Sequence, residues 1–375
     1  MATPASPSNS ATVRTAYLVL GMHRSGTSAV TQLLALAGAK LPSQVMVGDE
    51  HNAKGYFEPW RIAIFNDERL RAAGSAWDDP FTDPAANLPD AEDWLARAIK
   101  LFRDEYRRAK APLLKDPRVS VLLPLWRQVL EAEELTPHCV IPVRHPLAVA
   151  GSLAKRDGFP PVKSVLLWMT YMVETERGTR DLPRAFVEYD ALLADWRPVV
   201  KAMEAKLGAP LPKMTAKVEA AIDDFLTADL RHNKADDNLA PYGEIGVAAQ
   251  GVHQWLISAC RGETPDTAPM AAAWALIQRL RREIGPLVSP VTKSNNQALA
   301  ELAETRDALN YLRQQSAELQ SRSDEYARMN AQLGGHIENL TNQVQALTNQ
   351  ANSLEAILDE ELKRYGAMVV EPLIS

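Results

Sequence analysis

The fold of this chain is decided by the stretch Gly21-Met22-His23-Arg24-Ser25-Gly26-Thr27-Ser28. An apolar run at 16–20, typical of a strand, stands directly before it, and residues 29–37 behind it have a helical pattern. Strand, Gly/Ser/Thr-rich turn and helix together point backbone N–H groups and the positive end of a helix dipole at one spot. The sequence therefore predicts a phosphate-binding turn.

This turn differs from the loop that binds ATP or GTP. A Walker loop reads Gly, four residues, then Gly-Lys-Ser/Thr. Gly21 and Gly26 keep this spacing, but Thr27 occupies the lysine position and Arg24 is the cation inside the turn. The turn is therefore suited to bind phosphate but not to hydrolyse ATP or GTP.

The composition allows a folded enzyme and excludes several other classes. The chain has 375 residues, 46% of them apolar, which is enough for one large domain or two smaller ones. From Ser294 onward it carries 6 Lys/Arg and 12 Asp/Glu, and the part before has 35 of each. An electrically neutral domain argues against nonspecific nucleic-acid binding. Two cysteines are too few for a disulfide scaffold.

The N-terminal segment predicts no targeting signal. Residues 1–13 are polar and rich in Pro and Ser, which indicates a flexible leader without the apolar core of a signal peptide. No window approaches the roughly 18 apolar residues that span a bilayer. We expect a cytoplasmic protein with no transmembrane segment.

Short apolar runs alternate with helical patterns, which is typical of a three-layer α/β fold around a parallel sheet. Strands are expected at 17–20, 112–114, 139–143 and 185–189, and helices at 29–37, 119–135, 165–176 and 196–207. Active sites in such sheets lie at the carboxyl ends of the strands, where the Gly21 turn, Lys115 and Arg144 would meet. Residues 209–290 are mainly helical, with breaks at 236–246 and 262–269 and at the Pro-containing pairs 285–286 and 289–290.

A coiled coil is predicted at 298–365, after a linker at 291–297 and before a tail at 366–375. Apolar residues recur there at alternating spacings of three and four. The a positions are Leu302, Leu309, Ser316, Ser323, Asn330, Ile337, Val344, Ala351 and Leu358. The d positions are Thr305, Leu312, Leu319, Tyr326, Leu333, Leu340, Leu347, Leu354 and Glu361.

Leu at d, Val or Ile at a and one Asn at a favour a parallel homodimer, whose rod would be roughly 90 Å long. Ser316, Ser323 and the pair Gly334-Gly335 weaken the helix or its seam. Two other roles stay open: docking on a partner's helix, for example in a polysaccharide-export assembly, or packing back on the chain's own domain.

The position of Arg24 suggests the chemistry of the turn. Backbone N–H groups of Ser25, Gly26, Thr27 and Ser28 would bind a terminal phosphate, and Arg24 would reach the bridging oxygen of the leaving group. This layout suits transfer of a group attached to the phosphate, with the phosphate itself leaving. Sulfuryl transfer from 3′-phosphoadenosine 5′-phosphosulfate (PAPS) is such a reaction, and it needs no metal because a cationic side chain can neutralise the leaving phosphate.

Residues 20–28 resemble the 5′-phosphosulfate-binding loop of PAPS-dependent sulfotransferases, usually Pro-Lys/Arg-Ser-Gly-Thr-Thr/Ser, with His23 in place of Pro. A second family signature is a strand followed by an Arg and, eight residues later, a Ser, which grip the 3′-phosphate. Residues 140–152 match it, with Arg144 and Ser152 in these roles. The similarity is closest to bacterial sulfotransferases, through residues 49–58, 114–118 and 225–232. It covers roughly 14–290 and implies a P-loop-like sulfotransferase domain.

A hydroxyl acceptor needs a base to remove its proton. The resemblance places a Glu or His in the segment after the phosphate-loop helix, and the candidates are Asp49, Glu50, His51 and Glu58, together with His23. Glu58 is the first choice because the neighbouring residues 55–57 can bring it into a partly apolar site, and His51 is the second. Alternatively, Glu58 pairs with Arg61 or caps a helix that starts near Pro59.

Other candidate residues have ordinary structural alternatives. Lys115 and Arg118 could contact the donor sulfonate or the acceptor, or Lys115 could form an ordinary ion pair with Asp116 or with neighbouring residues. Arg144 could form a strand-end salt bridge, and Ser152 could bond its own backbone. A stacking surface for a sugar or adenine could include one of four tryptophans that otherwise pack in the core: Trp60, Trp77, Trp126 and Trp168.

The sequence thus predicts an enzyme that transfers sulfonate from PAPS to a hydroxyl and releases adenosine 3′,5′-bisphosphate. The resemblance favours a carbohydrate acceptor, such as a bacterial glycan or lipid-linked saccharide. A P-loop kinase or NTPase is disfavoured by Thr27 and by the lack of a clear magnesium-binding Asp strand. An inactive sulfotransferase-like module acting as a coiled-coil scaffold is the other alternative.

Overall fold

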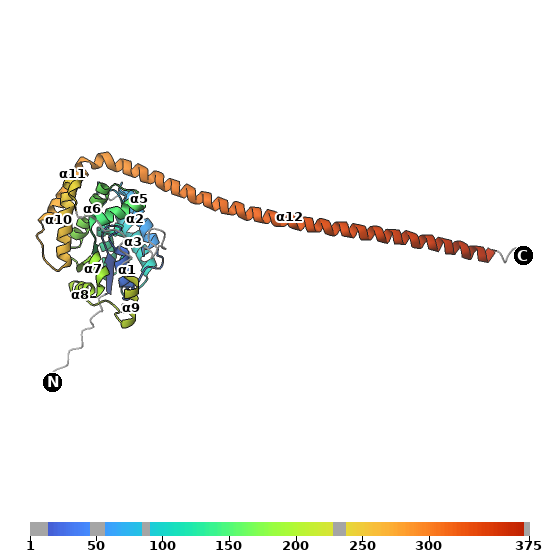
Figure 1. Ribbon diagram of the computed structural model, residues 1–375, viewed down its shortest axis with the longest axis horizontal. Helices are drawn as coiled ribbons and strands as arrows, with labels where there is room; N and C mark the ends of the chain where they lie inside the picture. Colours follow the sequence, from blue (N-terminus) through green and yellow to red (C-terminus); the bar gives the residue numbers. More distant parts are fainter. Residues whose placement is uncertain (1–13, 46–56, 85–90, 228–237, 371–375) are drawn as a thin grey trace, which may run out of the picture. The chain divides into compact units, whose positions relative to one another are not determined.

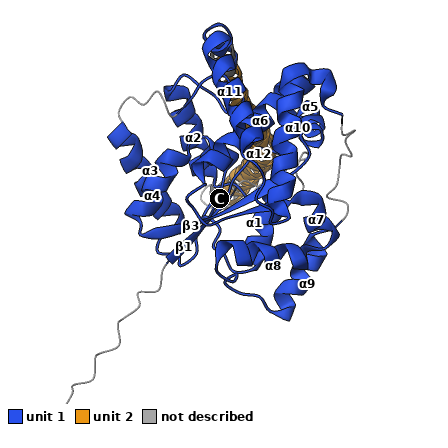
Figure 2. Ribbon diagram, turned by 90° about the vertical axis from the view of Figure 1, so that its left-hand side faces the viewer, with its two compact units in different colours: residues 1–296 blue, residues 297–375 orange. Residues whose placement is uncertain are grey.

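The computed structural model describes residues 14–45, 57–84, 91–227 and 238–370. The chain divides into two compact units, Met1–Asn296 and Gln297–Ser375 (Figure 2). The first unit contains a parallel sheet with helices around it, and the second belongs to one long helix. This confirms the predicted α/β class with a long C-terminal helix.

The sheet has four parallel strands in the order β2-β1-β3-β4. Their bounds are β1 Arg14–Val19, β2 Leu113–Lys115, β3 Leu135–Val143 and β4 Arg184–Glu188. In β1, Leu18 packs on one face of the sheet and Tyr17 and Val19 pack on the other. Apolar residues follow one another without polar gaps because both faces are buried.

Helices cover both faces of the sheet, which gives the expected three layers (Figure 1). One face packs against α1 (Thr27–Leu36), α7 (Tyr189–Ala194), α8 (Trp196–Leu207) and α9 (Ala216–Phe225). The other packs against α2 (Trp60–Ala72), α3 (Ala91–Tyr106), α4 (Leu123–Ala132), α5 (Pro146–Asp157), α6 (Pro161–Gly178), α10 (Gly243–Cys260) and α11 (Ala268–Glu283). A hydrophobic core therefore lies on each side of the strands.

The single helix predicted at 119–135 is wrong. The segment contains a 3-10 turn, η1 (Pro117–Ser120), then α4, and β3 already begins at Leu135. Asp116 caps η1 by accepting a hydrogen bond from the N–H of Arg118 at 3.1 Å. β3 extends further back than expected because residues 135–138 pair with 14–17 of β1, a contact that no local pattern shows.

The C-terminal helix α12 runs from Gly285 to Val370 (Figure 1). The residues expected to form a linker, 291–297, are helical, and the Pro-containing pairs expected to break the chain lie inside the helix. Pro286 falls in the first turn, where a backbone N–H has no intrahelical partner and proline is tolerated. Within the described ranges, no helix combines the length and the apolar character that crossing a bilayer requires.

Candidate active site

Three strand ends bring the sequence-predicted cations to one edge of the sheet. Lys115 is the last residue of β2, Arg144 follows β3 directly, and the Gly21 turn follows β1. Because the strands are parallel and neighbouring, their carboxyl ends open on the same side.

The turn after β1 adopts a backbone conformation that most residues avoid. Gly21 and Gly26 have φ angles of 121° and 94°, and Arg24 is left-handed at 67°. The N–H of Gly21 donates to Ser120 Oγ at 2.8 Å, which ties the turn to η1. A Cβ on Gly26 would lie 2.2 Å from Cδ2 of Tyr189. A side chain at position 26 is thus disfavoured by the positive φ angle and by the ring of Tyr189.

The start of α1 has no side-chain cap. Gly26 is its N-cap residue, and the N–H groups of the first turn, which belong to residues such as Thr27 and Ser28, point out of the helix end instead of bonding to a carbonyl four residues back. The N–H of Ser25, which we expected to bind the terminal phosphate, donates to the carbonyl of Met22 at 3.3 Å. Its hydroxyl is buried with no hydrogen-bond partner among the described residues.

The two predicted half-sites are bonded to each other. Arg24 Nε donates to Ser152 Oγ at 2.7 Å, across 128 residues of sequence. Arg144 Nη1 donates to the carbonyl oxygen of Arg24 at 3.0 Å, and its guanidinium lies 5.0 Å from the ring centre of Tyr189. Ser152 therefore accepts a hydrogen bond from the turn.

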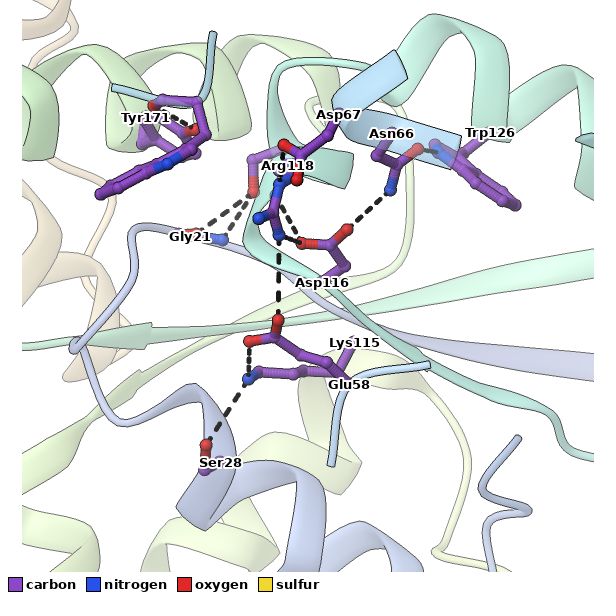
Figure 3. A network of polar contacts seen from close by, with 12 residues as sticks. Gly21, Ser28, Glu58, Asn66, Asp67, Lys115, Asp116, Arg118, Trp126 and Tyr171 are labelled. Atoms are coloured by element: carbon purple, nitrogen blue, oxygen red, sulfur yellow. Dashed lines mark hydrogen bonds and ion pairs between the residues drawn. The ribbon is translucent and has the colours of Figure 1, made fainter. Parts of the chain in front are cut away.

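Glu58 and Lys115 form a buried ion pair (Figure 3). Glu58 Oε1 and Lys115 Nζ are 2.6 Å apart, and the residues are 5% and 2% exposed. Arg118 Nη1 lies 3.8 Å from the other carboxylate oxygen. Lys115 Nζ is also 3.5 Å from Ser28 Oγ, at the start of α1. Lys115, which comes from β2, thus reaches the start of α1, where Thr27 occupies the position of the Walker-loop lysine.

The structural alternatives for Glu58 are not seen. Arg61 pairs with Asp104 and Glu105, at 3.4 and 3.3 Å. The helix α2 has Pro59 as its N-cap and no side-chain cap. Ion pairing does occupy Lys115, but its partner is Glu58.

A chain of hydrogen bonds fixes Arg118 (Figure 3). Its guanidinium contacts Asp67 at 2.6 Å and Asp116 at 2.9 Å. Asp116 accepts a hydrogen bond from the Asn66 amide at 2.8 Å, and the Asn66 carbonyl accepts one from the Trp126 indole at 3.0 Å. The side chains of Arg118, Asp116, Asn66 and Trp126 are thus all hydrogen-bonded, which is the condition for a stable buried charge.

Sequence reasoning missed Asn66, Asp67 and Tyr189. Asn66 is fully buried on α2, and a polar residue at a core position signals a hydrogen-bond partner. Tyr189, expected to end a strand, begins α7 and packs on Gly26 and Arg144. Both contacts of Tyr189 are long-range, so no local pattern marks it.

His23 is a buried imidazole beside Arg24. It is 7% exposed, its Nε2 has no hydrogen-bond partner among the described residues, and its ring lies 4.8 Å from that of Trp77. Burial lowers the pKa of His23 well below its usual range. Four nearby cations lower that pKa further: Arg156, Arg118, Lys115 and Arg24.

The remaining sequence candidates fall outside the described residues or are tryptophans. His51, Asp49 and Glu50 fall outside the described residues, as do 228–232 of the late element. Of the four tryptophans, Trp126 and Trp168 are fully buried in the core and Trp60 is 50% exposed. Only Trp77 adjoins the turn, and its ring stacks on Phe159 at 5.7 Å.

The chemical character of the site is cationic. Arg24, Lys115 and Arg144 come from three strand ends and surround a helix N-terminus, an arrangement suited to a ligand with several phosphate or sulfonate groups. In the part of the chain that the structure describes, no three His, Cys, Asp or Glu side chains are grouped to hold a metal ion.

No protein-family model matches the chain, and no curated protein matches it either. Among solved structures, it is similar to the sulfotransferase domain from the Synechococcus PCC 7002 olefin synthase, at 18% identity and a TM-score of 0.35, over 70% of this chain and 93% of that one. It is also similar to the sulfotransferase domain from the curacin biosynthetic pathway, at 15% identity and a TM-score of 0.33, over 69% and 96%. At these values the likeness says nothing about activity, which must be argued from the side chains.

Gly26→Ala is expected to destabilise the first unit more than Gly74→Ala. Both glycines have positive φ, but a Cβ on Gly74 meets nothing within 4 Å, so this control measures backbone strain alone, about 1 kcal/mol. The clash with Tyr189 should add roughly 1–3 kcal/mol. Urea denaturation of both variants checks this, and equal midpoints would contradict the close approach of Tyr189.

The free energy of unfolding should fall as the pH drops below about 6.5. The unfolded chain protonates His23 near pH 6.5, whereas the folded domain, with its lowered pKa, does so only at lower pH. The unfolded state therefore binds more protons in this range. As a result, the free energy of unfolding falls by up to about 1.4 kcal/mol for each pH unit.

His23→Gln should flatten the decline of the melting temperature between pH 6.5 and 5. His336→Gln, in the second unit, is the control for a histidine substitution outside the first unit. Equal slopes for His23→Gln and the unmodified protein would show that His23 is not held neutral.

Proposed function

We propose that the first unit transfers a sulfonate group from PAPS to a hydroxyl of an acceptor. The observation that carries the proposal is the direct bonding of the two half-sites, Arg24 to Ser152 at 2.7 Å and Arg144 to Arg24 at 3.0 Å. One ligand with phosphates at two positions can contact both half-sites together. The 5′-phosphosulfate would lie at the start of α1, and the 3′-phosphate at Arg144 and Ser152.

Glu58 and Lys115 supply the proposed chemistry. The acceptor oxygen attacks sulfur while its proton passes to the carboxylate of Glu58. The bond from sulfur to the 5′-phosphate oxygen breaks, and its electron pair stays on that oxygen, whose charge Arg24 and Lys115 neutralise. The products are a sulfate ester and adenosine 3′,5′-bisphosphate.

The contacts of Lys115 support this division of roles. Its ammonium lies 2.6 Å from Glu58 and 3.5 Å from Ser28, so it touches both the base and the turn that would hold the donor. A donor sulfonate at the start of α1 would compete with Glu58 for Lys115. Donor binding would thereby free the carboxylate to accept a proton.

Glu58→Gln should lower turnover at least about a hundredfold, because the amide keeps the shape but cannot act as a base. It should leave the affinity for adenosine 3′,5′-bisphosphate unchanged, since this nucleotide lacks the sulfonate that would compete with Glu58 for Lys115. Single-turnover assays and calorimetric titration of adenosine 3′,5′-bisphosphate measure the two effects. Glu176→Gln is the matched control: Glu176 is 2% exposed and paired with Arg180 and Arg184, away from the turn. Near-normal turnover in Glu58→Gln would end the assignment of the base.

Adenosine 3′,5′-bisphosphate should raise the melting temperature without magnesium, by several degrees at about 100 times its Kd. Arg144→Ala should abolish the shift, because the 3′-phosphate loses its cation. Arg127→Ala removes an exposed arginine paired with Asp181 and should keep the shift. Stabilisation by ATP with magnesium would instead indicate a kinase, and stabilisation by neither nucleotide a scaffold.

The carbohydrate class of the acceptor stays a prediction. Incubation with ³⁵S-labelled PAPS and cell extract, followed by glycan digestion of the products, tests it directly. Label released in saccharide fragments supports a carbohydrate acceptor. Label in protein or in a small metabolite contradicts this class but leaves sulfonate transfer intact.

A further inference from the structure

The second unit carries an exposed apolar stripe on α12. At the a and d positions of the heptads, eleven large aliphatic side chains are between 46% and 65% exposed. They are Leu302, Leu309, Leu312, Leu319, Leu333, Ile337, Leu340, Val344, Leu347, Leu354 and Leu358. A helix with such a stripe is completed by another helix that covers it.

We propose that a second copy of this chain covers the stripe, in a parallel and in-register two-stranded coiled coil. A fully exposed Leu side chain corresponds to roughly 60–120 Å² of apolar surface. At about 60% exposure, eleven such side chains on each helix come to roughly 1,200 Å² for the pair, within the range of specific interfaces.

The polar positions of the seam decide the direction. In a parallel pair each a residue meets its own copy, so Ser316, Ser323 and Asn330 meet equivalent polar residues, and paired Asn side chains fix the register. A fully overlapped antiparallel pair would set Ser316 against Leu347 and Ser323 against Leu340. Polar groups would then lie against apolar ones at several levels.

Parallel pairing also sets the apolar heptads of one chain against the same heptads of the other. From Leu333 to Leu358 every a and d residue is aliphatic, and in register these layers stack without interruption. Beside this block, Ile357 at g of one chain faces Leu362 at e of the other. Both are about 60% exposed on the isolated helix, so the parallel register covers them as well.

A hollow on the helix surface has the residues of a packing hole. It is lined by Ala351, Leu354, Glu355 and Leu358, together with Ile357 and Glu361. The first four are the a, d, e and following a positions, the four that surround a d side chain from the facing helix. The hollow therefore fits Leu354 of the second copy.

Cysteine cross-linking of the full chain tests both pairing and direction. In a parallel pair, Ser316→Cys lies at the seam against its own copy and should cross-link under mild oxidation at least about tenfold more than Gln314→Cys, an f position facing away. The unmodified protein controls for Cys139 and Cys260. Mixing Ser316→Cys with Leu347→Cys chains should yield no more 316–347 product than chance encounter, whereas an antiparallel pair would make it the main product.

Sedimentation gives the stoichiometry and keeps the proposal falsifiable if a cysteine variant fails to fold. The full chain should sediment at twice 41.3 kDa, and Leu340→Asp/Leu347→Asp should sediment as a monomer with the melting transition of the first unit unchanged. A monomer, a trimer or tetramer, or a dominant 316–347 cross-link would each overturn the proposal. None of these measurements depends on sulfonate transfer.

Discussion

The constraint on which the site depends is the common direction of four neighbouring strands. The central strand β1 pairs with β2 and β3 in a register that sets Val19 opposite both Lys115 and Val140. Since all strands run the same way, the turn at Gly21, the side chain of Lys115 and the start of Arg144 emerge at one edge. A slip of one residue would turn every side chain of a strand to the opposite face, so the two buried cores enforce this register.

Charge compensation within this edge shapes the rest of the site. Lys115 is almost fully buried, and a buried ammonium is stable only with a partner, which Glu58 provides. Arg118 needs its own compensation, which Asp67 and Asp116 supply. Arg24, Lys115 and Arg144 thus place positive charge around the start of α1, and carboxylates compensate the buried charge of Arg118 behind it.

The sequence predicted the parts of the fold whose cause is local. The strand–turn–helix at the N-terminus, helix α8 and the heptad stripe follow from patterns within one or two turns of the chain. The misjudged parts have distant causes: β3 starts at Leu135 because β1 pairs with it, and Tyr189 begins α7 above a glycine 163 positions away. At α12, Pro286 lies in the first turn of the helix, where proline is tolerated, so it does not end the helix as its local pattern predicted.

For the site, the sequence by itself determined which residue types line the turn and that three cations stand at strand ends, because strand ends and glycine-rich turns leave local signatures. Only the tertiary structure decided which charges meet. Glu58 pairs with Lys115 at a separation of 57 residues and not with the nearby Arg61, and Arg24 finds Ser152 at a separation of 128. The packing of the sheet and its helices decides these partners. It brings side chains that are distant in sequence within hydrogen-bonding distance and separates others that are close in sequence.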